Sequence, residues 1–206
     1  MADFADALQI DDSAIPVINV GPALDGSDVE GVAKKIHHAA TQSGFFYISG
    51  HGIPQEVMDA AFAVSRDFFE QPTAVKETVT VNIDQRGWMA TGMSKLQGAK
   101  THDLKEVFFW GAETAPDDPD VVQGKPLVAV NQWPDDNYPR LRTDLTPYYD
   151  SVCGVARQVM SALARSLDLP SDFFALAYEK PLARGQLVYY PPSTEFDEAE
   201  QRFGVA

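Results

Sequence analysis

The chain has 206 residues, 45% of them apolar and 22% charged, which is close to the average globular domain and excludes disordered, coiled-coil and collagen-like chains. A compact chain of this length buries about 70% of its unfolded surface and needs no disulfide bonds. Its 16 basic and 30 acidic residues give a net charge of −14, so nucleic acids and anionic membrane surfaces are not expected as partners.

The single cysteine, Cys153, permits no internal disulfide and is typical of a reducing compartment. The first residues lack the basic flank and apolar run of a signal peptide, and no stretch is long and apolar enough for a transmembrane helix. The sequence therefore predicts a soluble cytoplasmic protein, and its acidity is explained simply as solubility.

The front of the chain predicts a strand followed by a helix. A β-rich run covers residues 15–20 and ends at a Gly-Pro pair. The helix is expected to begin at Ser27, with Glu30 completing a capping box, and to end at Gly44. Its apolar positions recur at helical spacing: Val29, Val32, Ala33, Ile36 and Ala40.

A second strand and a second helix follow directly. The aromatic and β-branched run over residues 44–49 predicts a buried strand. Pro54 is expected to open the next helix, which ends at Gln71-Pro72. The front third thus alternates strand and helix.

The middle of the chain is less regular. Residues 83–102 contain three glycines without a sustained period and predict a long loop with short strands, followed by a strand over 106–110. The acidic, proline-rich stretch 115–120 indicates a solvated loop rather than a cation site, because it lacks the spacing of a calcium loop.

The rear of the chain predicts a long helix and one more strand. Residues 139–167 carry one continuous core stripe, with Pro147 as a possible kink: Leu141, Leu145, Tyr148, Val152, Val155, Val159, Leu163 and Leu167. A short helix over 171–178 follows, and then a strand over 185–190 that ends at Pro191-Pro192.

The histidines and the cysteine do not assemble a complete active site. His37 and His38 are adjacent on a helix and point about 100° apart, so they cannot share one metal from one face. His51 lies in a Gly-His-Gly-Ile-Pro turn, where it either bonds to the backbone or acts in catalysis, and His102 has no partner at a zinc-like spacing. Cys153 lies beside the long helical stripe, which favours a buried, inert thiol.

Several motifs, taken in their order and spacing, resemble one family, the isopenicillin N synthase-like non-haem iron oxygenases. They are Ile15-Pro16-Val17-Ile18, Ser43–Pro54, Arg86-Gly87-Trp88, Asp103–Phe108, Asn131-Gln132-Trp133-Pro134, Tyr148-Tyr149 and Tyr189-Tyr190-Pro191-Pro192. The resemblance identifies residues 1–12 as a flexible N-terminus and 13–206 as a non-haem dioxygenase N-terminal domain. It implies an α+β fold in which N-terminal helices lead into the first strands of a double-stranded β-helix, or jelly roll.

The resemblance also implies cofactors. Iron(II) is held in this family by a His-x-Asp pair and a distal histidine, and 2-oxoglutarate is consumed with oxygen to give succinate and carbon dioxide. The His-x-Asp motif is expected just beyond residues 203–206, where the sequence ends, and no histidine here has a carboxylate two residues later. We therefore expect an incomplete barrel, no metal ligands and no catalytic residues in this chain.

Three residues remain as candidates for binding. Alternation along the last strand places Gln186, Val188 and Tyr190 on one face. By resemblance, Tyr190 bonds a carboxylate of oxoglutarate or of the substrate, unless it is a core tyrosine. Gln186 stands where some members carry a basic residue, and it is assigned to the same cofactor site. Arg86 borders the substrate entrance or is a surface loop residue.

Three functions are compatible with these features. The first is the N-terminal portion of an iron(II)/2-oxoglutarate oxidoreductase that acts on a small molecule and is inactive alone. The second is a non-catalytic interaction or regulatory module, and the third is half of a split oxygenase completed by a second chain. In the second case the open edge of the unfinished sheet pairs with a partner chain, and in the third the ligands come from a complementing C-terminal chain. Self-association through the same open edge is the remaining alternative.

Overall fold

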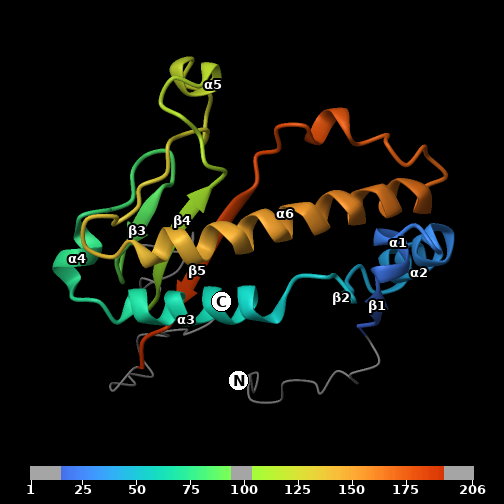
Figure 1. The fold of residues 1–206 in the computed structure, drawn as a ribbon, viewed down its shortest axis with the longest axis horizontal. Helices are drawn as coiled ribbons and strands as arrows, with labels where there is room; N and C mark the ends of the chain where they lie inside the picture. Colours follow the sequence, from blue (N-terminus) through green and yellow to red (C-terminus); the bar gives the residue numbers. More distant parts are fainter. Residues whose placement is uncertain (1–14, 94–103, 193–206) are drawn as a thin grey trace, which may run out of the picture. The chain divides into compact units, whose positions relative to one another are not determined.

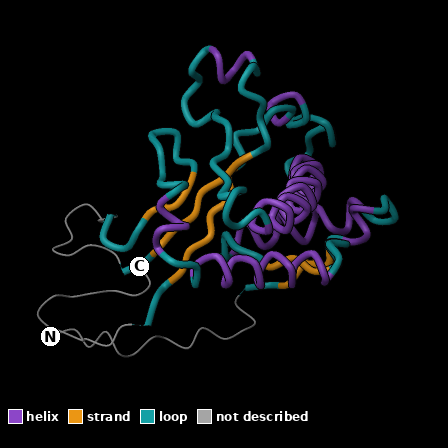
Figure 2. The backbone as a smooth tube through the Cα atoms, turned by 60° about the vertical axis from the view of Figure 1, so that its left-hand side comes forward, coloured by secondary structure: helices purple, strands orange, loops and turns teal. Residues whose placement is uncertain are grey.

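The computed structural model describes residues 15–93 and 104–192, and the other residues are drawn in grey (Figure 1). The described residues form helices and two small sheets, which confirms the α+β class (Figure 2). Residues 1–12, His102 and 203–206, for which expectations are given above, lie outside the described ranges.

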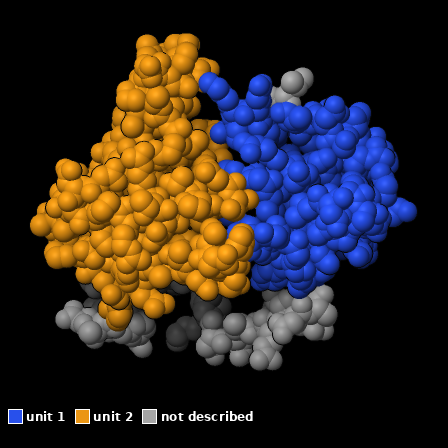
Figure 3. Space-filling model, viewed as in Figure 1, with its two compact units in different colours: residues 1–53, 152–181 blue, residues 54–151, 182–206 orange. Residues whose placement is uncertain are grey.

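The chain divides into two compact units, which are described separately (Figure 3). Unit 1 comprises Met1–Ile53 and Val152–Pro181, and unit 2 comprises Pro54–Ser151 and Leu182–Ala206. The long helix α6, Arg140–Ser166, contributes to both.

Unit 1 is built on a parallel pair of short strands packed against one helix. Strand β1 is Val17–Asn19 and β2 is Tyr47–Ser49, in the register Val17↔Tyr47. The helices are α1, Gly21–Leu24, α2, Val29–Gln42, and the 3-10 helix η2, Leu176–Tyr178. The core of this unit is formed by Ile18, Val20, Val32, Ile36, Ala39 and Ala162.

Helix α2 begins one residue later than expected. Its N-cap is Asp28, whose Oδ1 accepts a hydrogen bond from the Gly31 N–H at 2.8 Å. The predicted cap, Ser27, instead donates its N–H to Asp25 Oδ1 at 2.9 Å. An aspartate satisfies the free N–H groups of a first turn as well as serine does, so the capping rule allowed both positions.

The strand expected to be buried, β2, is exposed along its length. Tyr47 is 62% exposed and Ile48 37%, and Phe45 just before the strand is 71% exposed. The apolar run indicated the strand itself but carried no information on what covers it.

Unit 2 contains a three-stranded antiparallel sheet in the order β3-β4-β5. Its strands are β3, Gly87–Met89, β4, Glu106–Gly111, and β5, Arg184–Tyr189. Its helices are α3, Gln55–Phe69, α4, Thr73–Glu77, α5, Pro119–Val122, and the front part of α6. The core consists of Ala61, Val64, Phe68, Phe69, Val79, Trp88, Phe108, Trp110, Leu141 and Leu145.

Three further expectations need correction. The long stripe of α6 is not one continuous core, because Leu141 and Leu145 are fully buried whereas Val152 is 38% and Leu167 53% exposed. Cys153 is only partly buried. The acidic loop also contains the short helix α5, which Asp118 caps by accepting the Asp120 N–H at 2.8 Å.

Within the described ranges, no helix is long and apolar enough to cross a membrane.

The core of unit 2 makes a direct prediction. Phe68 is fully buried and meets Phe108 edge-to-face at 5.1 Å between ring centroids. We expect Phe68→Ala to lower the free energy of unfolding by about 3–5 kcal/mol, because it removes this contact and leaves a cavity. Urea denaturation measures the loss. Phe62→Ala, at a side chain of the same helix that is 72% exposed, is the matched control and should change stability little.

Candidate binding face

The β3-β4-β5 sheet has one face packed on the core and a second face that is exposed along β5, although Val107 of β4 on that second face is fully buried. Along β5, Leu187 and Tyr189 pack against the core of unit 2, while Gln186 and Val188 are exposed. Tyr190, just after the strand, is 38% exposed. This alternation agrees with the predicted sharing of one face by Gln186, Val188 and Tyr190, which we call the open face.

The side chains that share the open face with Gln186 are mostly apolar. Gln186 is the register partner of Phe109, and Val188 is the partner of Val107, which also pairs with Met89. Because register partners in an antiparallel sheet lie on the same side, Phe109 lies beside Gln186 on this face, with Val188 two residues later and Arg184 two residues earlier along the same strand. An apolar floor with a few polar groups is typical of a small-molecule site.

Tyr189 and Tyr190 are placed in opposite environments. The ring of Tyr189 stacks on Phe69, with centroids 5.2 Å apart and planes 15° from parallel. This stacking fixes which of the two tyrosines faces the core, since a shift of one residue would exchange them. That Tyr190 and Gln186 bind a carboxylate stays a prediction.

A buried ion pair holds the packed face of the sheet. Lys76 Nζ lies 2.7 Å from Glu106 Oε2 and also donates to the Phe69 carbonyl at 2.9 Å. Trp88 Nε1 donates to the same carboxylate oxygen at 2.8 Å. The Glu106 carboxylate thus joins α4, β3 and β4, and Lys76 connects them to the end of α3 through the Phe69 carbonyl. The motif that contains Glu106 was noted in the sequence, but its partners, 18 and 30 residues away, were not.

Arg86 is buried, not on the surface. Only 3% of it is exposed, and its guanidinium donates to the carbonyls of Asp84, Gln85 and Leu127. Burial lowers the pKa of Arg86, and the neighbouring Arg184 lowers it further. The alternative of a surface loop residue is therefore wrong, whereas a contact with substrate stays a prediction.

The space for Arg86 depends on Gly111. A side chain at residue 111 would begin 2.7 Å from Arg86 Nη2, so no residue larger than glycine fits without displacing the guanidinium. The register partner of Gly111 is Arg184, whose Nη1 donates to Gln85 Oε1 at 2.5 Å. The end of the sheet thus brings two arginines together.

The side chains of the Asn131-Gln132-Trp133 motif form hydrogen bonds at this end of the sheet. Asn131 accepts the Gly111 N–H at 2.8 Å and donates to the Gly111 carbonyl at 2.9 Å. Gln132 Nε2 donates to the Arg86 carbonyl at 2.6 Å, and Trp133 Nε1 to Glu113 at 2.7 Å. The motif that carried the resemblance therefore has a structural role.

Two histidines of the described residues, His37 and His51, bond to the backbone through their rings. His51 Nδ1 accepts the Ile53 N–H at 3.1 Å, which is the turn histidine that the sequence allowed as the simpler alternative. His37 Nδ1 lies 2.8 Å from the Ser166 carbonyl. Across residues 15–93 and 104–192, no group of three or more His, Cys, Asp and Glu side chains could hold a metal ion. The residues described here therefore do not fit an iron site.

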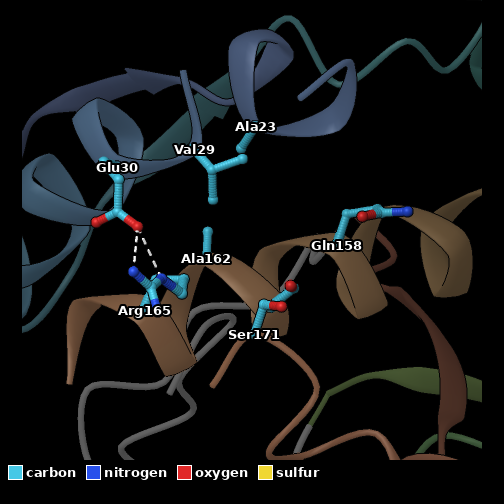
Figure 4. A pocket seen from close by; sticks show the side chains of 8 residues that line it. Ala23, Val29, Glu30, Gln158, Ala162, Arg165 and Ser171 are labelled. Carbon is cyan, nitrogen blue, oxygen red and sulfur yellow. Dashed lines mark hydrogen bonds and ion pairs between the residues drawn. The ribbon is translucent and has the colours of Figure 1, made fainter. Parts of the chain in front are cut away.

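A separate hollow of about 400 Å³ lies within unit 1 (Figure 4). Glu30 and Arg165 line it and form an ion pair, with Arg165 Nε 2.7 Å from Glu30 Oε1. Gln158, Ser161 and Ser171 supply the remaining polar groups. The two charges neutralise each other, and the lining has no nucleophile–base pair.

Comparison with known proteins shows the family. The family described as non-haem dioxygenase in morphine synthesis N-terminal matches residues 15–136, and the chain belongs to it. A 2-oxoglutarate-dependent dioxygenase from Didymella fabae is 30% identical over 188 residues, covering 87% of this chain and 57% of its own. Azadirone synthase LFS from Melia azedarach is 33% identical, covering 73% and 46%.

Solved structures agree with this assignment. A 2OG-Fe(II) oxygenase family protein from Caulobacter crescentus superposes with a TM-score of 0.76 at 26% identity, covering 91% of this chain and 59% of that one. A full-length protein from Neurospora crassa, crystallised in complex with alpha-KG, shares the fold at 24% identity, with a TM-score of 0.71 over 88% and 56% of the two chains. The chain thus spans about half the length of the relatives it matches.

The buried ion pair predicts a strong effect of removing one charge. We expect Lys76→Met to lower the free energy of unfolding by about 3–5 kcal/mol, because Glu106 is left buried without its cation. The double variant Lys76→Met/Glu106→Gln should recover part of this loss. Denaturant melts of the three proteins measure both effects, and equal losses in single and double variants would contradict the explanation.

A second prediction concerns iron. We expect the 206-residue chain to bind iron(II) no better than another protein of similar negative charge, because none of its histidines has a carboxylate two residues later. Anaerobic equilibrium dialysis measures the binding. Stoichiometric binding that is abolished by changing one histidine would show that the chain has a metal site.

Proposed function

We propose that this chain is the N-terminal part of an iron(II)- and 2-oxoglutarate-dependent oxidoreductase that acts on a small molecule. The open face is proposed to form one wall of its binding cavity, in a jelly roll that this chain builds only in part. The observation that carries the proposal is the exposure of Gln186, Val188 and Tyr190, whereas Leu187 and Tyr189 between them pack against the core.

The family and the names of its relatives support this reaction class. Relatives at 26–30% identity are named as 2-oxoglutarate-dependent or 2-oxoglutarate-Fe(II) enzymes, and this chain covers only 52–59% of their length. We place the iron ligands in the polypeptide that the relatives possess and this chain does not span. In that arrangement the 206 residues alone are inactive, and they supply a wall, not the metal centre.

The proposed roles follow from chemistry and position. The Tyr190 hydroxyl donates a hydrogen bond to a carboxylate of oxoglutarate or of the substrate, and the Gln186 amide donates a second one. Arg86 acts at the rim of the open face. A direct contact with substrate would require its guanidinium to exchange one of its three carbonyl partners for the ligand.

A split oxygenase is the second candidate, and one observation favours it. Within the described residues, β5 has β4 as its one neighbour in the sheet, so its outer edge offers backbone groups to a further strand. The outer edge of β3 is already occupied, because the Trp88 N–H donates to the Val79 carbonyl and the Trp88 carbonyl accepts the Val81 N–H. A second polypeptide that supplies strands and iron ligands would complete the same cavity. Restoration of activity by a separately expressed C-terminal half would support this arrangement over a single longer chain.

The proposal is tested at Tyr190 in a completed enzyme. Residues 1–206 are joined to the C-terminal part of a relative such as the Didymella fabae dioxygenase, and fusions that consume oxoglutarate are selected. We expect Tyr190→Phe to weaken oxoglutarate or substrate binding by roughly 10- to 150-fold, since a hydrogen bond to a charged acceptor contributes about 1.5–3 kcal/mol. Binding constants are measured by calorimetry.

Tyr189→Phe is the matched control, because Tyr189 lies on the packed face and keeps its stacked ring. It should change the binding constants little, and neither variant should shift the melting temperature by more than a few degrees. If Tyr189→Phe weakens binding and Tyr190→Phe does not, the assignment of the two faces is wrong. If neither does, Tyr190 has no role in binding.

A further inference from the structure

The Gly111 end of the open face holds two arginine side chains. Arg184 is the register partner of Gly111, so its side chain lies on the side of the sheet to which a side chain at Gly111 would point. A Cβ atom at Gly111 would meet Arg86 Nη2 at 2.7 Å. The Arg86 guanidinium therefore lies over Gly111, on the same face as Arg184 and Gln186. We call Arg86 and Arg184 the arginine pair.

Gln85 connects the two guanidinium groups. Its backbone carbonyl accepts a hydrogen bond from Arg86 Nη1 at 3.2 Å, and its side-chain Oε1 accepts one from Arg184 Nη1 at 2.5 Å. The φ angle of Gln85 is 55°, in the left-handed region that residues other than glycine adopt uncommonly. Because Gln85 is neutral, it holds the two cations together without neutralising either of them.

The positive charges of the arginine pair are not matched by nearby carboxylates. Among the described residues, neither guanidinium forms an ion pair. Three other arginines do form such pairs: Arg140, Arg142 and Arg165. Burial lowers the pKa of Arg86, Arg184 lowers it further, and Asp84 offsets only part of this effect. A single exposed arginine needs no ion pair, but two that are held together repel each other, and an anion placed between them removes this repulsion.

The two arginines differ in what they can offer to a ligand. Arg86 is 3% exposed, and its Nη1 and Nη2 donate to backbone carbonyls, while its buried Nε has no hydrogen-bond partner within the described ranges. Arg184 is exposed. Its planar guanidinium has further N–H donors besides the one that Gln85 accepts, and this geometry suits a carboxylate. Arg184 can therefore contact an anion directly, and Arg86 adds a fixed positive charge beside it.

The neighbouring side chains indicate the rest of the ligand. Beyond Gln186 on the same face lie Phe109, which is half-buried, and Val188, which is 40% exposed. An aromatic or aliphatic group attached to the carboxylate could pack on these side chains. One contacting guanidinium in a chain of net charge −14 favours a single negative charge over a multiply charged anion. Tyr190 is about 20 Å further along the strand, at roughly 3.4 Å per residue, so it bonds a different group.

We propose that Arg184 binds the carboxylate of a small apolar acid at the Gly111 end of the open face, with Arg86 supplying a second positive charge. In the completed enzyme this acid is the substrate, and this part of the proposal rests on the proposed function. The arginine pair and Gln85 all belong to unit 2, so the anion site can be tested on the 206-residue chain without any oxygenase activity.

Benzoate is the probe, and benzamide, which has the same ring without the charge, is its control. Nitrogen-edited NMR follows the Nε–H signals of Arg86 and Arg184 during the titration, with each signal assigned by its loss in Arg86→Lys or Arg184→Gln. We expect benzoate to shift both signals saturably and benzamide to shift neither. Sodium chloride should weaken the binding, because salt screens the attraction between the carboxylate and the guanidinium groups.

Variants locate the site. Arg184→Gln should raise the dissociation constant of benzoate at least roughly tenfold, since it removes a hydrogen bond between two charged groups. Gly111→Ala should also weaken binding, because its Cβ displaces the Arg86 guanidinium. Arg140→Gln is the matched control: Arg140 is an exposed arginine of unit 2 that is paired with Asp144 at 3.3 Å, and its loss should leave the dissociation constant unchanged. Circular dichroism establishes that each variant is folded.

Three outcomes would overturn the anion site. The first is the absence of a saturable shift with benzoate, and the second is equal binding of benzoate and benzamide. The third is a dissociation constant that Arg140→Gln raises as much as Arg184→Gln does. If benzoate binds the 206-residue chain but not the oxoglutarate-consuming fusion, a group of the added polypeptide occupies the arginine pair, and the assignment to the substrate is wrong.

The anion site and the proposed function fail in different ways. If benzoate binds at the arginine pair but Tyr190→Phe leaves both binding constants of the fusion unchanged, the proposed role of Tyr190 fails and the anion site stands. If benzoate does not bind and Tyr190→Phe weakens oxoglutarate binding, the anion site fails and the proposed function stands.

Discussion

The hydrogen bonds to the buried carboxylate of Glu106 connect the elements that form the core of unit 2. This carboxylate accepts hydrogen bonds from Lys76 and Trp88, and Lys76 also holds the last turn of α3 through the Phe69 carbonyl. Because an ionised carboxylate is costly to bury without such partners, the contact selects one arrangement of α3, α4, β3 and β4. That arrangement places the Phe69 ring where Tyr189 stacks on it, and this stacking leaves Tyr190 on the open face.

Much of the local structure could be predicted from the sequence, because it depends on neighbours in the chain. The strand over 106–110, the helix opened by Pro54 and the strand ended by Pro191 were all predicted, since hydrophobic periodicity and proline act over a few residues. The one-residue error at the start of α2 has the same local origin: Asp28 and Ser27 are both good caps.

Burial was predicted less well, because it depends on distant contacts. The run around Tyr47 has the same pattern whether or not another layer covers it, and the stripe of α6 has the same pattern whether it serves one core or two. The two-residue period of a strand predicted which face of the sheet Tyr190 lies on. No such pattern predicted that Arg86 is buried. One of its carbonyl partners, Leu127, lies 41 residues away, and no periodicity indicates such a contact.

The two sheets differ in what their uncovered faces can do, although each is covered by helices on its other face. The open face of β3-β4-β5 combines apolar side chains with the Gln186 amide and the Tyr190 hydroxyl, so a ligand bound there, as we propose, would be oriented by specific hydrogen bonds. The β1-β2 pair exposes Val17 and Tyr47 on one side, which are aliphatic and aromatic surface with one hydroxyl. A surface with so few polar groups has little to orient a small polar ligand. The distribution of polar groups therefore supports the proposal that a ligand binds at β3-β4-β5 rather than at β1-β2.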